Sequence, residues 1–510
     1  QFTDSLTWVH GSHQVKFGVD HRFTRLNWFA QTFPSGKFNF DSGLTSNPQS
    51  PAGTGISSAT YLLGQVSGGQ QTVAPAFALG SWSQGWYVQD DFKVSRRLTL
   101  NLGLRYDLTA PPVERYNRNS SFDPYLLNTE TGRLGTLTYA GVNRPDSFVD
   151  WDRNNFGPRF GFAYTVTRDN RTVLRGGYAL VYVPVESADM HGNAPNSLGF
   201  SSNTTFSSSG PYAAFQFSDG PTALIQPLGS TGGPSAFRGQ GVNYQDRNAP
   251  VPYVQQWNLT LQRELLRGWT ASLSYVGNHG VKLVGGNYNV NQLNPQYFAQ
   301  YGLALQDQVP NPFYGQIKTG ALSAATISRS QSLLLLPDYQ GVGTLANHNA
   351  DSIYHSVQVT VERRFSRGLS LLASFTGGKL IDDSTSNSSG ESGDGTFRIG
   401  AYNRRLDRAI DPSDISRRLV VSGVWQLPLA GKSRGILHAI ASGWQTNGIL
   451  TMQSGTPLTV TGSNNFTGIN FPDLVGDPNQ GDQSVKRWFN TSAFANPAPY
   501  VMGNAPRTLP

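Results

Sequence analysis

Residues 86–107 read WYVQDDFKVSRRLTLNLGLRYD, and apolar and polar side chains alternate along both halves of this stretch. From Leu98 to Leu108 every even position is apolar, whereas the odd positions hold Thr, Asn, Gly, Arg and Asp. A period of two residues is typical of a β-strand with one apolar face. The polar residues Ser95 to Arg97 separate the halves, so the sequence predicts a β-hairpin, with Asp90 as the one exception on its apolar face.

The same unit recurs along the chain and predicts about twelve strands. The expected strands are 2–10, 15–23, 86–94, 98–108, 156–166, 173–183, 257–265, 269–275, 357–365, 369–375, 418–427 and 444–453. Within the hairpins the turns are short, whereas long segments rich in Gly, Ser, Asn, Pro and aromatic residues join one hairpin to the next. These long segments are 24–83, 109–155, 184–252, 278–352 and 378–416.

Strands of about 9–11 residues can cross a bilayer, and long loops at one end with short turns at the other are typical of outer-membrane barrels. The predicted fold is therefore all-β: a transmembrane antiparallel up-and-down β-barrel, one domain over residues 1–510, with long extracellular loops and short periplasmic turns. A soluble β-sandwich also alternates, but it favours short loops at both ends and Lys and Glu on its polar face. The polar face here is rich in Thr, Ser, Gln, Asn, Gly and Arg.

The composition excludes several other classes. Charged residues make up 14% and hydrophobic residues 38% of the 510 positions, and no apolar run approaches the roughly 18 residues of a membrane helix. The chain has no Cys, which excludes disulfides and thiol chemistry. The net charge of +7 is spread along the chain, so we expect no nucleic-acid partner.

Two sets of residues are predicted from their strand positions. Aromatic residues near strand ends suggest a girdle at the lipid interfaces: Trp86, Tyr106, Trp257, Trp269, Tyr275, Phe365, Trp425 and Trp444. Charged residues on polar strand faces are predicted to face the lumen: Arg105, Asp107, Arg159, Arg175 and Glu362.

We expect no enzymatic activity, no cofactor and no metal, because nucleophile-elbow, zinc-protease and phosphate-loop motifs are missing from the sequence. His10 and His13 flank a turn without further ligands. The acidic residues Asp382, Asp383, Glu391 and Asp394 lack the spacing of a calcium loop.

The hairpin over residues 86–107 resembles the barrel hairpin of TonB-dependent outer-membrane receptors. NFGPRFGFAY at 155–164, QWNL at 256–259, SYVG at 274–277 and QSGTP at 453–457 resemble the Oar-like branch, whose members usually carry a carboxypeptidase-regulatory-like domain. The resemblance implies 22 strands closed around an N-terminal plug. With about twelve strands, no plug, no regulatory-like domain, no TonB box and no aromatic-ended last strand, the chain is predicted to be a barrel fragment.

The implied function is a receptor and transporter in the bacterial outer membrane that imports a scarce solute: a glycan, a peptide or a siderophore. Implied partners are outer-membrane lipid, the receptor's own plug domain and the TonB complex. Loop segments 206–217 and 311–315, with Phe313 and Tyr314, offer aromatic and polar groups for a ligand. Alternatives are a passive porin or surface adhesin-type barrel, and a secreted soluble glycan-binding β-protein.

Overall fold

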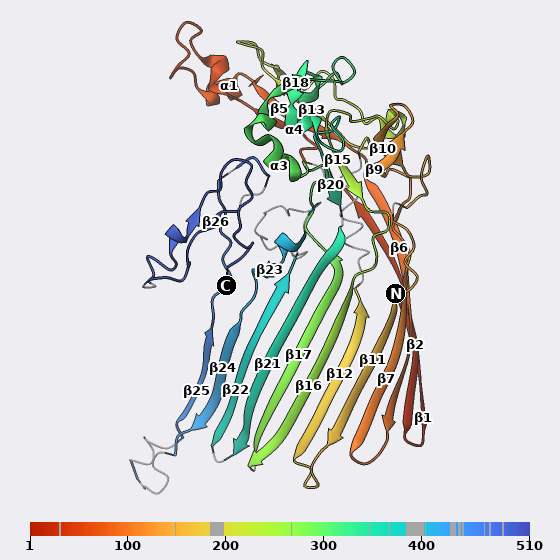
Figure 1. The fold of residues 1–510 in the computed structure, drawn as a ribbon, viewed down its shortest axis with the longest axis vertical. Coiled ribbons are helices and arrows are strands. Elements are labelled where there is room, and N and C mark those ends of the chain that lie inside the picture. Colours follow the sequence, from red (N-terminus) through yellow and green to blue (C-terminus); the bar gives the residue numbers. More distant parts are fainter. Residues whose placement is uncertain are drawn as a thin grey trace.

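Twelve long strands form one antiparallel sheet in chain order (Figure 1). The computed structural model describes residues 1–29, 32–147, 149–183, 198–266, 268–345, 347–366, 368–383, 402, 404–428, 435–436, 440, 443–463, 465–468, 471–481 and 484–509. The strands are β1 (Phe2–His10), β2 (His13–Trp28), β6 (Phe77–Lys93), β7 (Leu98–Thr109), β11 (Phe156–Thr165), β12 (Thr172–Tyr182), β16 (Tyr253–Leu266), β17 (Trp269–Val284), β21 (His348–Ser366), β22 (Leu369–Asp382), β24 (Arg417–Gln426) and β25 (Gln445–Gln453). Two short strands, β8 (Val113–Glu114) and β23 (Ala409–Ile410), pair with β6 and β22.

The up-and-down topology is confirmed, because each long strand pairs antiparallel with the strands before and after it. The short turns lie at one end of the sheet and the long connections at the other (Figure 1). The connection from β24 to β25, residues 427–444, is the longest at the short-turn end.

Several strands are longer than the sequence predicted, and the largest extensions are at the end that meets the long connections. β6 begins at Phe77 rather than Trp86, β17 continues to Val284, and β21 begins at His348. Apolar alternation is lost in these extensions, yet the backbone ladder continues: Leu79 still pairs with Leu26. The hydrogen bonds between two strands need only backbone partners, whereas the alternation of apolar and polar side chains depends on what surrounds the two faces of the sheet.

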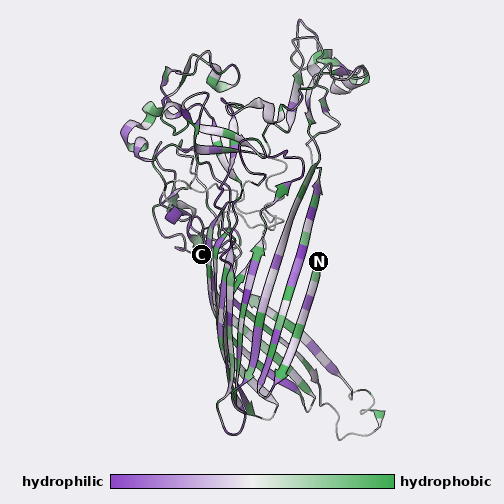
Figure 2. Cartoon of the chain, turned by 90° about the vertical axis from the view of Figure 1, so that its right-hand side faces the viewer, coloured by the Kyte–Doolittle hydropathy of each residue, from purple (hydrophilic) through white to green (hydrophobic). Residues whose placement is uncertain are grey.

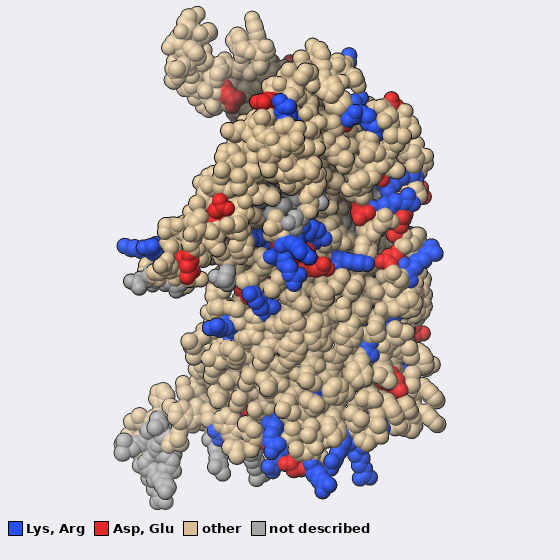
Figure 3. Space-filling model, viewed as in Figure 1, with Lys and Arg blue, Asp and Glu red and all other residues tan. Residues whose placement is uncertain are grey.

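The register separates an apolar face from a polar face. Leu102 and Phe160 are paired across β7 and β11, and Leu261 is paired with Leu273 across β16 and β17. These side chains point away from any protein core, and Leu102 is 42% exposed. Green patches along the strands mark such residues (Figure 2). Between the two ends of the strands, the face of the molecule in view carries few charged side chains (Figure 3). A sheet with one apolar uncovered face is suited to lipid rather than to water.

The sheet is open, since among the described residues β1 and β25 each pair with only one long strand. Two edges therefore present unpaired backbone groups, which lipid cannot satisfy.

Most of the buried core lies among the long connections, and a small cluster of Phe77 and Leu79 lies at the loop end of β6. Phe122, Leu137, Tyr139, Val242, Val290, Leu336, Tyr339 and Val342 form its largest cluster. The connecting segments were predicted as loops, whereas the structure folds them, together with the segment after β25, into a layer that we call the loop layer. It is composed of the described residues of 29–76, 110–155, 198–252, 285–347, 402–416 and 454–509. Aromatic and branched residues in these segments pack against one another, which stabilises the layer by burial.

Short strands and helices build the loop layer. They are β3 (Lys37–Asn39), β4 (Gln65–Val66), β5 (Gly68–Val73), β9 (Ser120–Asn128), β10 (Arg133–Tyr139), β13 (Ser202–Ser207), β14 (Phe215–Gln216), β15 (Gly241–Gln245), β18 (Gln308–Pro310), β19 (Thr326–Ser328), β20 (Gly341–Leu345), β26 (Asp473–Leu474), β27 (Phe494–Ala495), α1 (Ser57–Leu62), α3 (Gln296–Tyr301) and α4 (Arg329–Ser332). The parallel pair β15–β20 joins two connections that are about a hundred residues apart in sequence, so the connections fold together.

Substitution of Gly277 tests the close contact of an aromatic ring with the sheet. Trp257 is the cross-strand partner of Gly277, and a Cβ atom at Gly277 would lie 2.2 Å from the indole Cε2. Gly277→Val therefore displaces the indole, and we expect the barrel to lose about 1–3 kcal/mol, the usual cost of overpacking. The measurement is urea-induced unfolding of the protein in lipid vesicles.

The matched control is Gly448→Val on β25, where an added Cβ meets nothing within 4 Å. This variant should be close to neutral, because valine favours strands. Equal losses for the two variants would contradict the predicted contact with Trp257.

Candidate functional site

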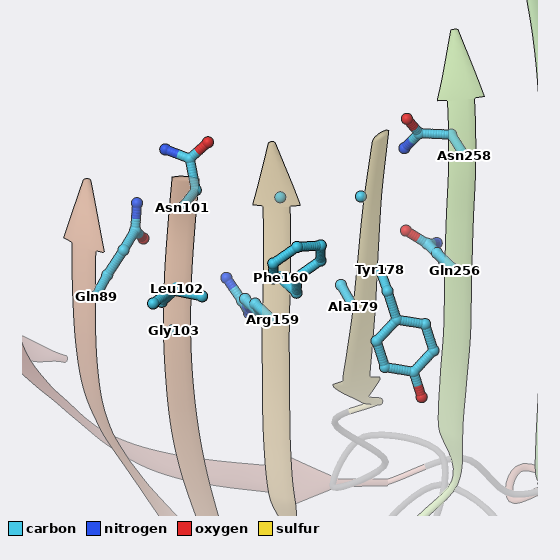
Figure 4. A pocket seen from close by; sticks show the side chains of 12 residues that line it. Gln89, Asn101, Leu102, Gly103, Arg159, Phe160, Tyr178, Ala179, Gln256 and Asn258 are labelled. Carbon is cyan, nitrogen blue, oxygen red and sulfur yellow. The ribbon is translucent and has the colours of Figure 1, made fainter. Parts of the chain in front are cut away.

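The polar face of the sheet carries a row of amides and a hollow. Gln89, Gly103, Arg159, Ala179 and Gln256 are successive cross-strand neighbours from β6 to β16. With Asn101 and Asn258 they line a pocket of about 300 Å³. In Figure 4 these side chains rise from separate strands toward one space. Amides both donate and accept hydrogen bonds, so this wall suits a hydrated or peptide-lined interior.

Arg105 and Asp107 lie near the loop end of the same face and form an ion pair. Arg105 Nη2 lies 2.7 Å from Asp107 Oδ1, and its Nε donates to both carboxylate oxygens at 2.8 and 2.9 Å. Gly85 leaves room for the guanidinium, because a Cβ there would lie 2.1 Å from Arg105 Nη2. Asp20 and Arg22 line the same 130 Å³ pocket. Bidentate geometry fixes both side chains.

The five predicted lumen residues share one face by register but do not form one cluster. Arg159 lies across from Gly103, and Arg175 lies across from Thr260 on β16. Glu362 of β21 pairs with Thr270 of β17 and is exposed. Within this set, Arg105 and Asp107 form an ion pair. That these residues face a lumen stays a prediction.

The predicted aromatic girdle divides into two groups along the strands. Trp269, Phe365, Trp425 and Trp444 lie at or beside the short-turn end. Trp86, Trp257 and Tyr275 lie inside strands, not at their ends as predicted, because β6, β16 and β17 extend beyond the alternating segments. Trp86 stacks on Tyr106 at a centroid distance of 5.8 Å. The role of both groups at lipid interfaces stays a prediction.

The two predicted ligand residues have opposite environments. Phe313 is 3% exposed and packs with Ile317, Leu322 and Ile327 inside the loop layer. A buried ring has no surface for a ligand, so this prediction was wrong for Phe313. Tyr314 is 64% exposed and remains available.

The segment 206–217 also serves packing more than binding. Phe206 and Phe215 contact each other at a centroid distance of 4.9 Å, and Phe38 packs beside both. β13 pairs with β5, which fixes this aromatic cluster to a distant connection. Sequence alone offered no partner for these rings.

A larger pocket of about 680 Å³ lies within the loop layer. Residues 289–340 form part of its wall, and Tyr402, Phe466 and Tyr500 complete it. Such a volume is typical of small-molecule sites. The sequence analysis missed this pocket, because its residues come from three separated segments without a shared motif.

Neither a metal-binding group nor a membrane-spanning helix occurs among the described residues. Among the described residues, no three His, Cys, Asp or Glu side chains form a group that could hold a metal ion; Glu391 and Asp394 lie outside the described residues. His13 Nδ1 lies 2.7 Å from Asp90 Oδ2. In the part of the chain that the structure describes, no helix has the length and hydropathy needed to cross a bilayer.

The sequence of residues 1–509 matches the family model described as "Outer membrane beta barrel domain". The chain belongs to this family. Its location is therefore the outer membrane, which excludes the secreted soluble β-protein. No curated protein sequence matches the chain.

Solved structures of outer-membrane proteins are similar at low identity. The outer membrane transporter YddB from Escherichia coli shares 10% identity at a TM-score of 0.43, over 91% of this chain and 43% of that chain. The ferripyoverdine receptor of Pseudomonas aeruginosa shares 10% identity at a TM-score of 0.37, over 90% and 38%. The FrpB iron transporter from Neisseria meningitidis shares 10% identity at a TM-score of 0.35, over 83% and 40%. This chain thus spans about two fifths of their length.

The loop layer of this barrel protein contains a buried phenol that predicts a pH effect. Burial, with a smaller contribution from Glu130, raises the pKa of Tyr139 from 10.0 to about 12. Its hydroxyl donates to the Gly233 carbonyl at 3.2 Å. The unfolded phenol ionises first, so the stability from Tyr139 is complete below about pH 10 and is lost as the pH rises toward 12. Tyr139→Phe should make the alkaline loss of near-UV circular dichroism less steep.

The control is Tyr212→Phe, since Tyr212 is exposed. It should leave the alkaline transition unchanged. Identical transitions for Tyr139→Phe and the parent protein would contradict the predicted pKa effect.

Proposed function

We propose that the chain is the barrel portion of an outer-membrane receptor and transporter of the TonB-dependent type, Oar-like branch, which imports a scarce solute. In the complete protein a plug domain fills the lumen, and the inner-membrane TonB complex supplies energy. The other proposed partners are outer-membrane lipid and a solute bound by the loop layer. No enzymatic activity is proposed.

The observation that carries this proposal is the open twelve-stranded sheet. An open sheet of twelve strands supports a place in a wider barrel, and barrels of about 22 strands are transporters with a plugged lumen. The amide-rich polar face supports the same reading, because amides and paired charges can contact a plug through hydrogen bonds. The sequence resemblance of residues 86–107 supports the receptor type, and the stretches 155–164, 256–259, 274–277 and 453–457 support the family branch.

Energy-dependent uptake tests the proposal. Cells that produce the protein are given a radiolabelled solute, and uptake is compared with and without a protonophore and in a strain without TonB. We expect uptake above diffusion to be lost in both cases. Uptake that persists without TonB would contradict the proposal and favour the passive porin.

Liposome swelling separates the same alternatives in vitro. A passive porin leaves an aqueous channel and should admit small sugars into vesicles at once. The complete receptor, whose plug domain fills the lumen, should not cause swelling. The adhesin-type barrel predicts neither swelling nor energy-dependent uptake.

A further inference from the structure

We propose that the 680 Å³ pocket of the loop layer binds an uncharged oligosaccharide. This inference rests on the proposed function, since it names the class of solute that the receptor would capture. The pocket lies between residues 289–340 and the segment that follows β25.

The two walls are held together by an aromatic cluster. Tyr500 is buried against Phe298 and Leu305, with ring centroids 5.9 Å from Phe298 and 5.6 Å from Phe466. The Tyr500 amide also donates to the Asn465 carbonyl at 2.7 Å. The pocket is therefore formed by packing within the folded layer.

Buried hydrogen bonds fix the wall formed by residues 289–340. Asn291 Nδ2 donates to the carbonyls of Leu336 at 2.8 Å and Tyr339 at 3.2 Å, and its Oδ1 accepts from the Leu336 amide at 2.9 Å. The Tyr402 hydroxyl donates to the Gln292 carbonyl at 3.3 Å. A pre-formed wall lowers the ordering cost of binding.

The chemistry of the lining selects the ligand class. Of the described residues that line the pocket, none is Asp, Glu, Lys or Arg. A buried anion or cation needs charged or strongly donating partners, so this lining disfavours an ionic solute. Gln306, Gln340 and Ser330 provide amide and hydroxyl groups, which match the paired donor and acceptor character of sugar hydroxyls.

The lining also has exposed aromatic rings, on which a sugar ring can pack. Phe466 is 49% exposed, Tyr402 is also exposed, and both line the pocket. The face of a pyranose ring carries only C–H groups, and such a face packs well on an aromatic ring. Amides and aromatic rings that line one pocket fit a neutral sugar better than a purely apolar ligand.

Phe466 and Tyr500 both adopt a left-handed backbone, with φ of 66° and 61°. Bulky residues rarely occupy this region, and such residues gather at ligand sites. Here the strained positions place two stacked rings at one pocket.

Isothermal titration of the chain in lipid nanodiscs tests the inference. The probes are maltohexaose, cellohexaose, xylohexaose, mannohexaose and chitohexaose, compared with ferrioxamine B and a neutral hexapeptide. We expect at least one of these sugars to bind. Phe466→Ala and Tyr402→Ala should each weaken it by about tenfold, the loss of one aromatic contact.

Two further variants separate binding from folding. Phe466→Tyr keeps the ring and should bind as the parent protein does, whereas Tyr212→Ala removes an exposed ring that does not line the pocket and should have no effect. The inference is overturned if no sugar binds, if both alanine variants bind the sugar normally, or if Phe466→Ala weakens only ferrioxamine B or the peptide. Each of these outcomes concerns only the sugar. TonB-dependent uptake is tested separately, because its energy dependence can be measured with any imported solute.

Discussion

Leu102→Arg is expected to destabilise the protein in a bilayer by about 2–4 kcal/mol, the cost of an Arg at the bilayer midplane on the lipid face of a barrel. Leu102 lies near the middle of the alternating part of β7, beside Phe160 of β11. Its side chain is exposed on the apolar face, so an arginine there must enter lipid or distort it. Urea-dependent unfolding from lipid vesicles measures the loss.

Asn101→Arg is the matched control, one residue away on the opposite face. Asn101 lines the pocket of the polar face, so an arginine at that position meets polar groups and water. We expect a change within about 0.5 kcal/mol, as for ordinary surface sites. If Asn101→Arg were the more damaging variant, the two faces would be assigned the wrong way round.

Phe122→Ala is expected to cost the loop layer about 3–5 kcal/mol, the usual loss for a large ring removed from a core. Phe122 is fully buried and packs on Tyr339 at a centroid distance of 4.6 Å. The cluster joins β9, β10, β15 and β20, so a cavity here loosens several connections together. Hydrogen exchange followed by mass spectrometry measures the loss, through faster exchange around Leu137 and Val342.

Leu126→Ala on the same strand provides the comparison, because Leu126 is exposed. It should leave exchange in the cluster unchanged. The ladder of β16 and β17 should keep its protection in both variants, since the core lies outside the sheet. Rapid exchange throughout the loop layer of the parent protein would contradict a folded layer.

The alternation of apolar and polar side chains predicted the long strands well, because a strand that contacts lipid must be apolar on one face. β1, from Phe2 to His10, begins and ends at the predicted residues, and β7 differs by one residue at Thr109. The start of β6 at Phe77 was not predictable in this way. Beyond the lipid region, backbone pairing continues without any demand on side-chain pattern.

Exceptions to the alternation were explained only by long-range pairing. Asp90 breaks the apolar face, and the structure places it beside His13, which stacks on Phe92 at a centroid distance of 4.1 Å. Arg263 breaks the apolar face of the strand that holds Trp257, Leu259, Leu261 and Leu265. Its Nη1 donates to the Thr172 hydroxyl at 2.9 Å. Both partners come from a different strand, so no local pattern reveals them.

Only part of the candidate site was predicted, because some of its residues meet through long-range contacts that no local pattern reveals. Strand position placed Arg105 and Asp107 on the polar face, where they form their ion pair. The loop-layer pocket joins Asn291 with Phe466 and Tyr500. Each of these two residues lies more than 170 positions after Asn291 in the sequence. Phe313 was misjudged because an aromatic residue in a polar segment can equally pack in a core.

The most direct test of the barrel assignment is a spin-label scan along β7. The chain has no Cys, so single cysteines at each position from Leu98 to Thr109 can be labelled without a background. Collision rates with oxygen and with a nickel chelate are then measured in lipid vesicles. We predict alternation: high oxygen accessibility at Leu100, Leu102 and Leu104, and high nickel accessibility at Asn101 and Gly103. Accessibility without a period of two, or with the two faces reversed, would contradict the assignment.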